Sequence, residues 1–246
     1  MISFIVPAHN EELLLGQALS ALQKAAQASG EFFEIIVVDD ASTDRTAAIA
    51  RQHGVRVISV NHRHIAATRN AGARQARGEY LFFVDADTLA TPEAVAAGIK
   101  ALQSGAVGGG CVFNFDGHLP FWAKILHPVG VSVGRIIRLV GGCFLFCRAD
   151  VFRAIGGFNE RFYAAEELIF IQALKQRGRF VVPPAWVLTS GRKIRTNTLL
   201  EICRVLMGMW IRGPASIQSR DRLDIWYGQR HHDPLHQDGQ LKQLNS

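Results

Sequence analysis

The chain has 246 residues, of which 48% are hydrophobic and 20% are charged, so it has the composition of a globular protein and not of a disordered one. Its length suffices for one large α/β domain or for one domain with a short appendage, and its formal net charge is +6. The chain shows no N-terminal signal pattern and no apolar run of membrane-spanning length, so we expect a cytoplasmic protein with reduced cysteines.

Strands and helices alternate in the first part of the chain. Apolar runs rich in β-branched and aromatic residues predict strands at 2–6, 34–38, 55–60 and 80–84. Helical spacing and N-cap signals predict helices at 11–28, between Asp44 and Gly54, at 65–77, and from Thr91-Pro92-Glu93 onward. This alternation indicates a doubly wound, mostly parallel sheet that is flanked by helices.

The pattern changes beyond residue 105. The sequence predicts a glycine-interrupted strand at 107–115, an amphipathic helix at 121–139, a strand at 144–147, a helix at 165–176, strands at 180–182 and 186–189, and a final helix at 198–211. We interpret these elements as an extension of the first half and not as an independent domain. The predicted organisation is one domain over 1–195, with halves 1–105 and 106–195, then a helical extension over 196–230 and a polar tail over 231–246.

The positive charge is concentrated in the C-terminal third of the chain. Residues 171–230 contain eleven Lys and Arg residues against three acidic ones, so the remainder is slightly acidic. Such asymmetry favours an anionic partner such as phosphate, an acidic acceptor or an anionic membrane surface, and a solvated basic face is an equal alternative. No nucleic-acid-binding module is recognisable, so we expect no nucleic acid partner. The apolar final helix, which carries Arg204 and Arg212, either packs on the core or docks peripherally on a membrane or a partner.

The strand predicted at 80–84 ends in two carboxylates, Asp85 and Asp87, separated only by Ala86. In an open α/β sheet, ligands bind at the carboxyl ends of the strands. Two acids at this spacing repel one another when they are desolvated, unless a positive charge lies beside them. A divalent metal with a phosphorylated ligand supplies such a charge. The alternative is a strand end at which the aspartates cap the next turn.

With a second acidic strand end at Asp39-Asp40, the chain resembles the family-2 glycosyltransferases, which have the GT-A fold. The resemblance extends from the N-terminus to about Arg195. It implies a GT-A-type nucleotide-binding sheet with a C-terminal acceptor-side extension, a nucleoside-diphosphate sugar donor, and a divalent metal, Mg²⁺ or Mn²⁺. The matching segments are residues 7–11, 37–46, 69–72, 83–87, 156–162 and 166–167.

The resemblance also implies roles for individual residues. Asp40 corresponds to the acid that hydrogen-bonds the nucleotide base, with Asp39 as a more structural neighbour, and an Asx turn is the alternative for Asp40. Asp85 corresponds to the ribose-contacting acid and Asp87 to the metal ligand. Arg69 is expected to pair with the base or the diphosphate unless it forms a surface ion pair. The residues expected to bind the nucleotide sugar are Pro7, Ala8, Glu11, Asp39, Asp40, Arg69, Asp85, Ala86 and Arg192.

Glu166 and Glu167 occupy the position of an acid pair, usually Glu-Asp, at a helix start in this family. The second member usually deprotonates the acceptor hydroxyl, so the resemblance implies that Glu167 is the catalytic base. Glutamate replaces aspartate here and reaches one methylene group further, which leaves Glu166 as the alternative base. The helix dipole alone also explains two acids at a helix start.

The predicted function is the transfer of a sugar from a nucleoside-diphosphate sugar to an unidentified hydroxyl acceptor, in a metal-dependent and, by resemblance, inverting reaction. The alternative is a non-catalytic nucleotide-sugar-binding or scaffold protein with the same fold, against which the intact Asp85, Asp87 and Glu167 argue. A nucleotidyltransferase would need a Gly-rich, basic phosphate loop after the first strand, and residues 7–12 contain none.

Overall fold

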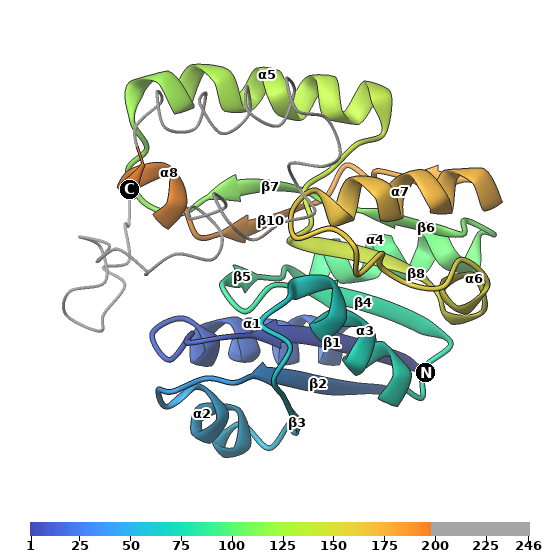
Figure 1. Ribbon diagram of the computed structural model, residues 1–246. Helices are drawn as coiled ribbons and strands as arrows, with labels where there is room; N and C mark the ends of the chain where they lie inside the picture. The colour runs from blue at the N-terminus through green and yellow to red at the C-terminus, as the bar shows by residue number, and fades with distance from the viewer. Residues whose placement is uncertain (198–246) are drawn as a thin grey trace.

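The computed structural model describes residues 1–197 and shows a central sheet between layers of helices (Figure 1). The sheet has seven strands in the order β3-β2-β1-β4-β8-β6-β9. Neighbouring strands are parallel except at β8, which is antiparallel to both β4 and β6. The predicted mostly parallel sheet is therefore confirmed. The strand bounds are β1 (Ile2–Ala8), β2 (Phe33–Asp40), β3 (Arg56–Val60), β4 (Tyr80–Val84), β6 (Gly108–Gly110), β8 (Phe144–Arg148) and β9 (Phe180–Val181).

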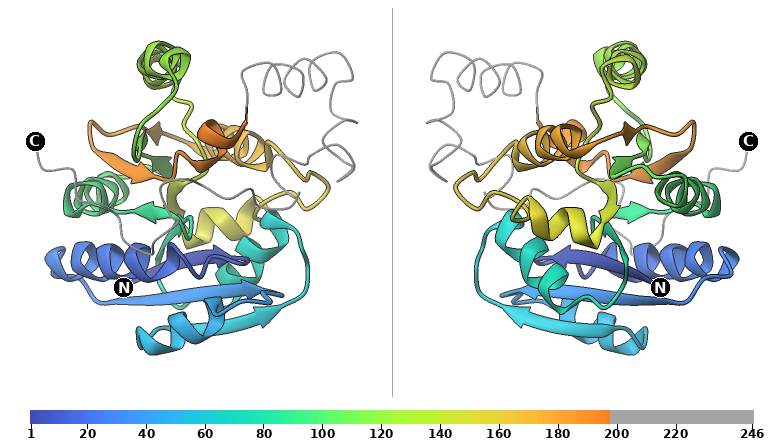
Figure 2. Two further views of the ribbon diagram at one scale, coloured as in Figure 1. Left: turned by 90° about the vertical axis from the view of Figure 1, so that its left-hand side faces the viewer. Right: turned by 90° about the vertical axis from the view of Figure 1, so that its right-hand side faces the viewer.

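Helices cover both faces of this sheet (Figure 2). One face is covered by α1 (Leu15–Ala28), α2 (Thr46–Gln52) and α4 (Pro92–Gln103). The other is covered by α3 (Ile65–Gln75), α6 (Ala149–Ala154) and α7 (Glu166–Arg177). Two hydrophobic cores result, one on each face of the sheet.

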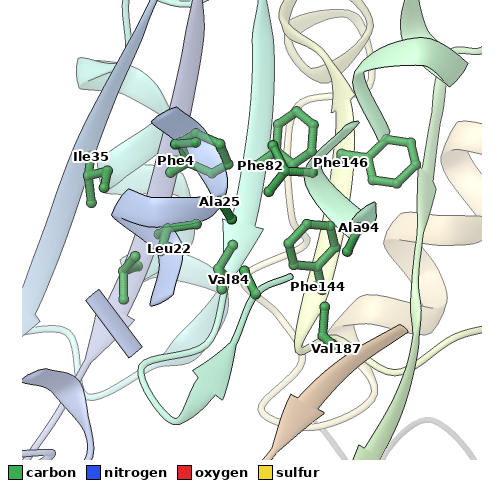
Figure 3. Packing of buried hydrophobic residues seen from close by; sticks show 14 of the residues in the cluster. Phe4, Leu22, Ala25, Ile35, Phe82, Val84, Ala94, Phe144, Phe146 and Val187 are labelled. Carbon is green, nitrogen blue, oxygen red and sulfur yellow. The ribbon is translucent and has the colours of Figure 1, made fainter. Parts of the chain in front are cut away.

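Four phenylalanine side chains pack in the core beneath α1 and α4 (Figure 3). The ring of Phe82 lies 5.1 Å from that of Phe4, 5.8 Å from that of Phe144 and 5.4 Å from that of Phe146, measured between centroids. Because successive side chains of a strand point to opposite faces, the neighbouring Phe83 belongs to the second core. The continuous apolar run of β4 is explained by this burial on both faces.

A smaller sheet of three strands, in the order β5-β10-β7, lies beside the central one. It is formed by β5 (Thr88–Leu89), β7 (Val112–Phe115) and β10 (Trp186–Thr189). The strand predicted at 107–115 is therefore divided at Cys111 between two sheets. The helix α5 (Phe121–Ile137) lies above β7 and β10 at the periphery, and the short α8 (Arg192–Thr196) follows β10 (Figure 1).

The start of α4 was predicted correctly from a local sequence signal, whereas the start of α1 was not. Thr91 caps α4 as predicted, since its Oγ1 accepts a hydrogen bond from the N–H of Ala94 at 3.1 Å. The helix predicted from Glu11 instead begins at Leu15. The N–H of Glu11 donates to Oγ1 of Thr46 at 2.7 Å, so the preceding residues form a turn that is tied to the loop before α2.

The described residues contain no helix that is both long enough and apolar enough to cross a membrane. Cys111, Cys143 and Cys147 are buried free thiols, in agreement with the sequence interpretation. The final helix predicted at 198–211 lies outside the described residues, as do the polar tail and all but the first two residues of the predicted extension over 196–230. The predicted domain boundaries stay predictions.

Candidate active site

Predicted site residues meet at the carboxyl edge of the central sheet, where β2, β1 and β4 are neighbours. Asp39 and Asp40 end β2, Pro7 and Ala8 end β1, and Asp85 directly follows β4. The parallel register pairs Ala8 with Asp39. These residues, which are far apart in the sequence, therefore line one edge, as expected for a ligand site in an open α/β sheet.

Asp40 is held by the protein itself. Its Oδ1 accepts hydrogen bonds from the N–H groups of His62 (2.7 Å) and Arg63 (2.8 Å), and its Oδ2 accepts from the N–H of His64 (3.1 Å) and the hydroxyl of Thr68 (2.7 Å). Burial disfavours the charged carboxylate, but these hydrogen bonds outweigh it and lower the pKa of Asp40. Asp40 therefore fastens the loop before α3 to the end of β2.

Asp39, the adjacent residue, differs from Asp40 in its hydrogen bonds. It is 7% exposed, and its Oδ1 accepts no hydrogen bond from the described residues. A buried carboxylate oxygen without a donor is energetically costly, so a ligand N–H at this position would be stabilised. Between the two aspartates, the free acceptor capacity thus lies on Asp39.

Arg69 of α3 lies beneath this edge and is only 2% exposed. Its Nη2 donates to Oδ1 of Asp85 at 2.9 Å and to the carbonyl oxygen of Gly142 at 3.1 Å, while its Nη1 donates to Oε1 of Glu166 at 2.8 Å. Burial opposes the guanidinium charge, but the carboxylates of Asp85 and Glu166 prevail and raise the pKa of Arg69. Arg69 is therefore an interior bridge between the end of β4 and the start of α7, and not a surface ion pair.

Glu166 and Glu167 form the first turn of α7. Glu166 is 6% exposed, and burial together with the charge of Glu167 raises the pKa of Glu166 to about 8, while Arg69 acts in the opposite direction. Glu167 is half-buried and packs against Gly142, where an added Cβ would lie 3.3 Å from the Cβ of Glu167 and 3.2 Å from Nη2 of Arg69. Gly142 thus permits the close approach of both side chains.

Asp87 lies among carboxylates and beside the cations of α8. Burial and the charges of Glu11 and Asp85 raise the pKa of Asp87 to about 7, whereas Lys193 and Arg192 act to lower it. The Nη2 of Arg192 lies 3.4 Å from Oε1 of Glu11 and 4.0 Å from Oδ2 of Asp87. The fold therefore gathers residues from the loop after β4, from α8 and from the turn after β1 around Asp87.

Asp116, which the sequence interpretation did not single out, fixes the position of α8. Its Oδ1 accepts a hydrogen bond from the N–H of Gly191 at 2.7 Å and lies 2.9 Å from Nη1 of Arg195. Asp116 also lines, with Asp87, a small cavity of about 30 Å³. The only signal in the sequence is an isolated acid after an aromatic strand, which predicts no role by itself.

The oxygen donors at this edge suit a divalent cation. Mg²⁺ and Mn²⁺ prefer carboxylate and phosphate oxygens, and Asp85 and Asp87 present such oxygens in a cluster whose mutual repulsion contributes to the raised pKa of Asp87. No three His, Cys, Asp or Glu side chains in residues 1–197 form a preassembled metal cage. A bound cation would therefore need further ligands from a substrate or from water.

Comparison with known families matches residues 3–156 to the family described as Glycosyl transferase family 2. This segment is more than half of the chain and contains Asp39, Asp40, Arg69, Asp85 and Asp87. The acid pair at the start of α7 and the cations of α8 lie beyond it.

Two curated relatives share the first part of the chain. The dolichol-phosphate mannosyltransferase of Pyrococcus furiosus is 31% identical over 148 residues, which are 55% of this chain and 40% of the relative. The undecaprenyl-phosphate 4-deoxy-4-formamido-L-arabinose transferase of Pseudomonas paraeruginosa is 36% identical over 103 residues, which are 39% of this chain and 30% of the relative. The chain thus spans less than half the length of either relative.

A solved structure extends the likeness to most of the chain. The mannosyltransferase PcManGT from Pyrobaculum calidifontis, in complex with GDP-Man and Mn²⁺, is similar with a TM-score of 0.67, covering 88% of this chain and 66% of that chain at 21% sequence identity. At this identity the likeness shows the fold alone. That fold is GT-A, as the sequence resemblance implied.

Proposed function

The chain belongs to glycosyl transferase family 2, and from this premise we propose that it transfers a sugar from a nucleoside-diphosphate sugar to an acceptor oxygen with inversion. In this reaction the acceptor oxygen attacks the anomeric carbon and loses its proton to a base. The bond between that carbon and the diphosphate breaks, and the nucleoside diphosphate leaves with the electron pair. The alternative is a non-catalytic protein of the same fold, which either binds the nucleotide sugar without turnover or serves as a scaffold.

We assign the nucleotide end of the donor to the ends of β1 and β2. Asp40 is occupied by the loop before α3, so its role is to position that loop. Asp39 has an oxygen that accepts no hydrogen bond from the described residues, and it is the better acceptor for a ring N–H of the base. Pro7 and Ala8, which end the neighbouring strand β1, then form the adjoining wall.

The diphosphate end is assigned to the cluster around Asp87. Asp87, with Asp85 beside it, would hold a divalent cation together with diphosphate oxygens, and the complex of PcManGT with GDP-Man and Mn²⁺ supports this assignment. When bound, such a cation stabilises negative charge on the leaving group. Arg192 already lies near Glu11 and Asp87, so its guanidinium is placed to pair with the same diphosphate.

The observation that carries the proposal is the buried bridge from Asp85 through Arg69 to Glu166. It joins the end of β4 to the start of α7 across the interior, and it therefore fixes Glu167 relative to the donor edge. Glu166 is engaged by Arg69, whereas Glu167 is half-buried and packs against Gly142. Glu167 is therefore the proposed base that removes the proton from the acceptor hydroxyl.

The test is calorimetric titration of the full chain with UDP, GDP, CDP, ADP and dTDP, each with and without Mn²⁺. We expect one nucleoside diphosphate to bind in a metal-dependent manner, and Asp87→Ala to abolish that dependence because the proposed ligand oxygen is lost. Asp150→Ala is the matched control, since Asp150 is an exposed acid paired with Arg148 at the surface.

Each result of this titration has a definite meaning. Metal-dependent binding that survives in Asp87→Ala would remove the assignment of the metal ligand. The absence of binding by any of the nucleotides to a folded protein would favour the scaffold alternative.

A further inference from the structure

Residues 117–149 contain no Asp or Glu, and this stretch includes the whole of α5. Asp116 and Asp150 bracket the stretch, and its charged side chains are Lys124, Arg135, Arg138 and Arg148. The chain has 21 acidic residues, and none of them lies in this stretch. Positive charge is therefore concentrated on the peripheral helix α5. The catalytic proposal does not use any of these cations.

The inward face of α5 is attached to the protein at defined points. Ala123 is buried, and Nε2 of His127 lies 2.9 Å from the carbonyl oxygen of Phe113 in β7. The ring of His127 also packs against that of Phe115, with 4.9 Å between centroids. The helix is therefore fixed on the small sheet in one orientation, and its opposite face points away from the protein (Figure 2).

The outward face of α5 is apolar. Phe121 is 79% exposed, Val129 is 58% exposed and Ile136 is 81% exposed. At 3.6 residues per turn these side chains share one side of the helix, and only Ser132 interrupts them. The other exposed apolar side chains of this face are Ile125, Leu126, Val133 and Ile137. A continuous apolar face of this size marks an interaction surface.

The cations of α5 lie at the edge of this face. Lys124 and Arg135 are three turns apart on one flank of the helix, and Arg138 ends it. All three are exposed, and none forms an ion pair with another residue of the part of the chain that the structure describes. An apolar helix face bordered by unpaired cations and free of acids is the pattern of a helix that lies in a membrane interface.

We propose that α5 docks the protein on an anionic lipid surface, with its apolar face in the headgroup region and its cations on lipid phosphates. The charge pattern decides against a second copy of the chain, because a symmetric contact between two such helices would bring unpaired cations together without an acid to compensate. Anionic lipids supply the missing negative charge.

This docking would place at the membrane a helix that leads directly into the active site. The chain leaves α5 at Arg138 and within four residues reaches Gly142, whose carbonyl oxygen accepts a hydrogen bond from Arg69. The docking surface and the floor beside Glu167 are therefore parts of one short segment. The inference does not depend on the proposed transfer reaction, because lipid binding is measured without a donor or an acceptor.

The test is flotation of the full chain with vesicles of phosphatidylcholine alone and with vesicles of phosphatidylcholine and phosphatidylglycerol in equal parts. We expect binding to the anionic vesicles that weakens with added salt. The double variant Val129→Asn with Ile136→Asn should bind at least about tenfold more weakly, because two exposed apolar side chains are lost from the interface. Lys124→Gln with Arg135→Gln should reduce mainly the preference for anionic lipid.

The control is Phe32→Asn, which removes a side chain that is 87% exposed on another part of the surface and should leave vesicle binding unchanged. Equal binding by the α5 variants and the wild type would overturn the proposal, as would the absence of binding to anionic vesicles. Size-exclusion chromatography with light scattering tests whether a second copy of the chain covers this face instead. A dimer that the α5 substitutions convert to monomer would identify the face as a contact between copies and would also overturn the proposal.

Discussion

Two of the pairs of adjacent acids in the chain show the same division of contacts: Asp39-Asp40 at the end of β2 and Glu166-Glu167 at the start of α7. In each pair one carboxylate is engaged by the protein: Asp40 by the loop before α3, and Glu166 by Arg69. Its neighbour is left with free acceptor capacity, since Asp39 has an oxygen without a donor and the Glu167 carboxylate forms no hydrogen bond with the described residues.

The physical reason differs between the two regions. In a strand, successive side chains point to opposite faces, so Asp39 and Asp40 must enter different surroundings. In a helix, successive side chains are turned by about 100°, so Glu166 points inward to Arg69 while Glu167 lies toward Gly142. In each pair, two identical neighbours therefore divide into one positioning residue and one residue available to a ligand.

The largest expected effect is on kcat, which we expect to fall more on substitution of Glu167 than on substitution of Glu166. Glu167→Gln should reduce kcat by about 10²-fold or more while nucleotide binding is retained, because an amide cannot take the acceptor proton. Glu166→Gln keeps an oxygen that accepts the hydrogen bond from Arg69, so we expect kcat to fall by less than about tenfold. Steady-state kinetics and nucleotide titration of both variants measure the difference.

Two outcomes would change this assignment. A greater loss in Glu166→Gln than in Glu167→Gln would make Glu166 the base, and the two acid pairs would then not divide their roles in the same way. Unaltered turnover in both variants would mean that no general base is needed, as for an acceptor oxygen that is already ionised.

The next largest effect is on the free energy of unfolding, which we expect to fall more on substitution of Asp40 than on substitution of Asp39. Asp40→Asn presents an NH₂ group to N–H donors, and we expect the free energy of unfolding to fall by about 1–3 kcal/mol. Asp39→Asn should change it by less than about 0.5 kcal/mol but weaken nucleotide binding. Urea denaturation and calorimetry separate the two quantities. Equal destabilisation by the two substitutions would contradict the division of roles.

Acidification provides an independent check of the Asp40 effect. The pKa of Asp40 is lowered in the folded protein, so its contribution is complete above the ordinary value of 3.8 and is lost as the pH falls through the lower folded-state value. The difference in stability between the wild type and Asp40→Asn should therefore shrink on acidification, when the wild-type carboxyl also becomes protonated.

The first half of the fold could be predicted from the sequence because its signals are local and agree with one another. Apolar runs define β1, β2 and β4, and the Thr91 cap with Pro92 defines the start of α4. The beginning of α1 could not be predicted, because a contact between Glu11 and Thr46 decides it. The division of 107–115 between two sheets likewise depends on strand pairing and not on local propensity.

At the site, the sequence indicated which residues lie close together but not which hydrogen bonds and ion pairs each of them forms. The motifs pointed to Asp39, Asp40, Asp85 and Asp87, and the parallel sheet brings the ends of β2 and β4 to one edge. The interior role of Arg69 needs Glu166, which lies 97 positions away, so no local pattern could reveal it. The role of Asp116 was missed for the same reason, because its partner Arg195 follows another strand.

The smallest expected effect concerns the pH dependence of metal binding at Asp87. Its pKa is raised to about 7, so without metal the folded protein holds a proton there between pH 3.8 and 7 that the unfolded chain has lost. The free energy of unfolding of the metal-free protein should therefore decrease as the pH rises through this window. A cation must displace the same proton, so Mn²⁺ affinity should rise by up to about tenfold per pH unit and level off above neutrality.

Electron paramagnetic resonance of free Mn²⁺ across this pH range measures that affinity without any turnover. Glu11→Gln extends the test, since the charge of Glu11 is, after burial, the largest cause of the raised pKa of Asp87. Removing that charge should shift the midpoint of the affinity curve to lower pH, whereas Asp150→Ala should not move it. A curve that is flat through neutral pH in the wild type would mean that Asp87 is already ionised before the metal binds. The cations Arg192 and Lys193 would then outweigh the neighbouring carboxylates, and α8 would be the element that sets the charge of the site.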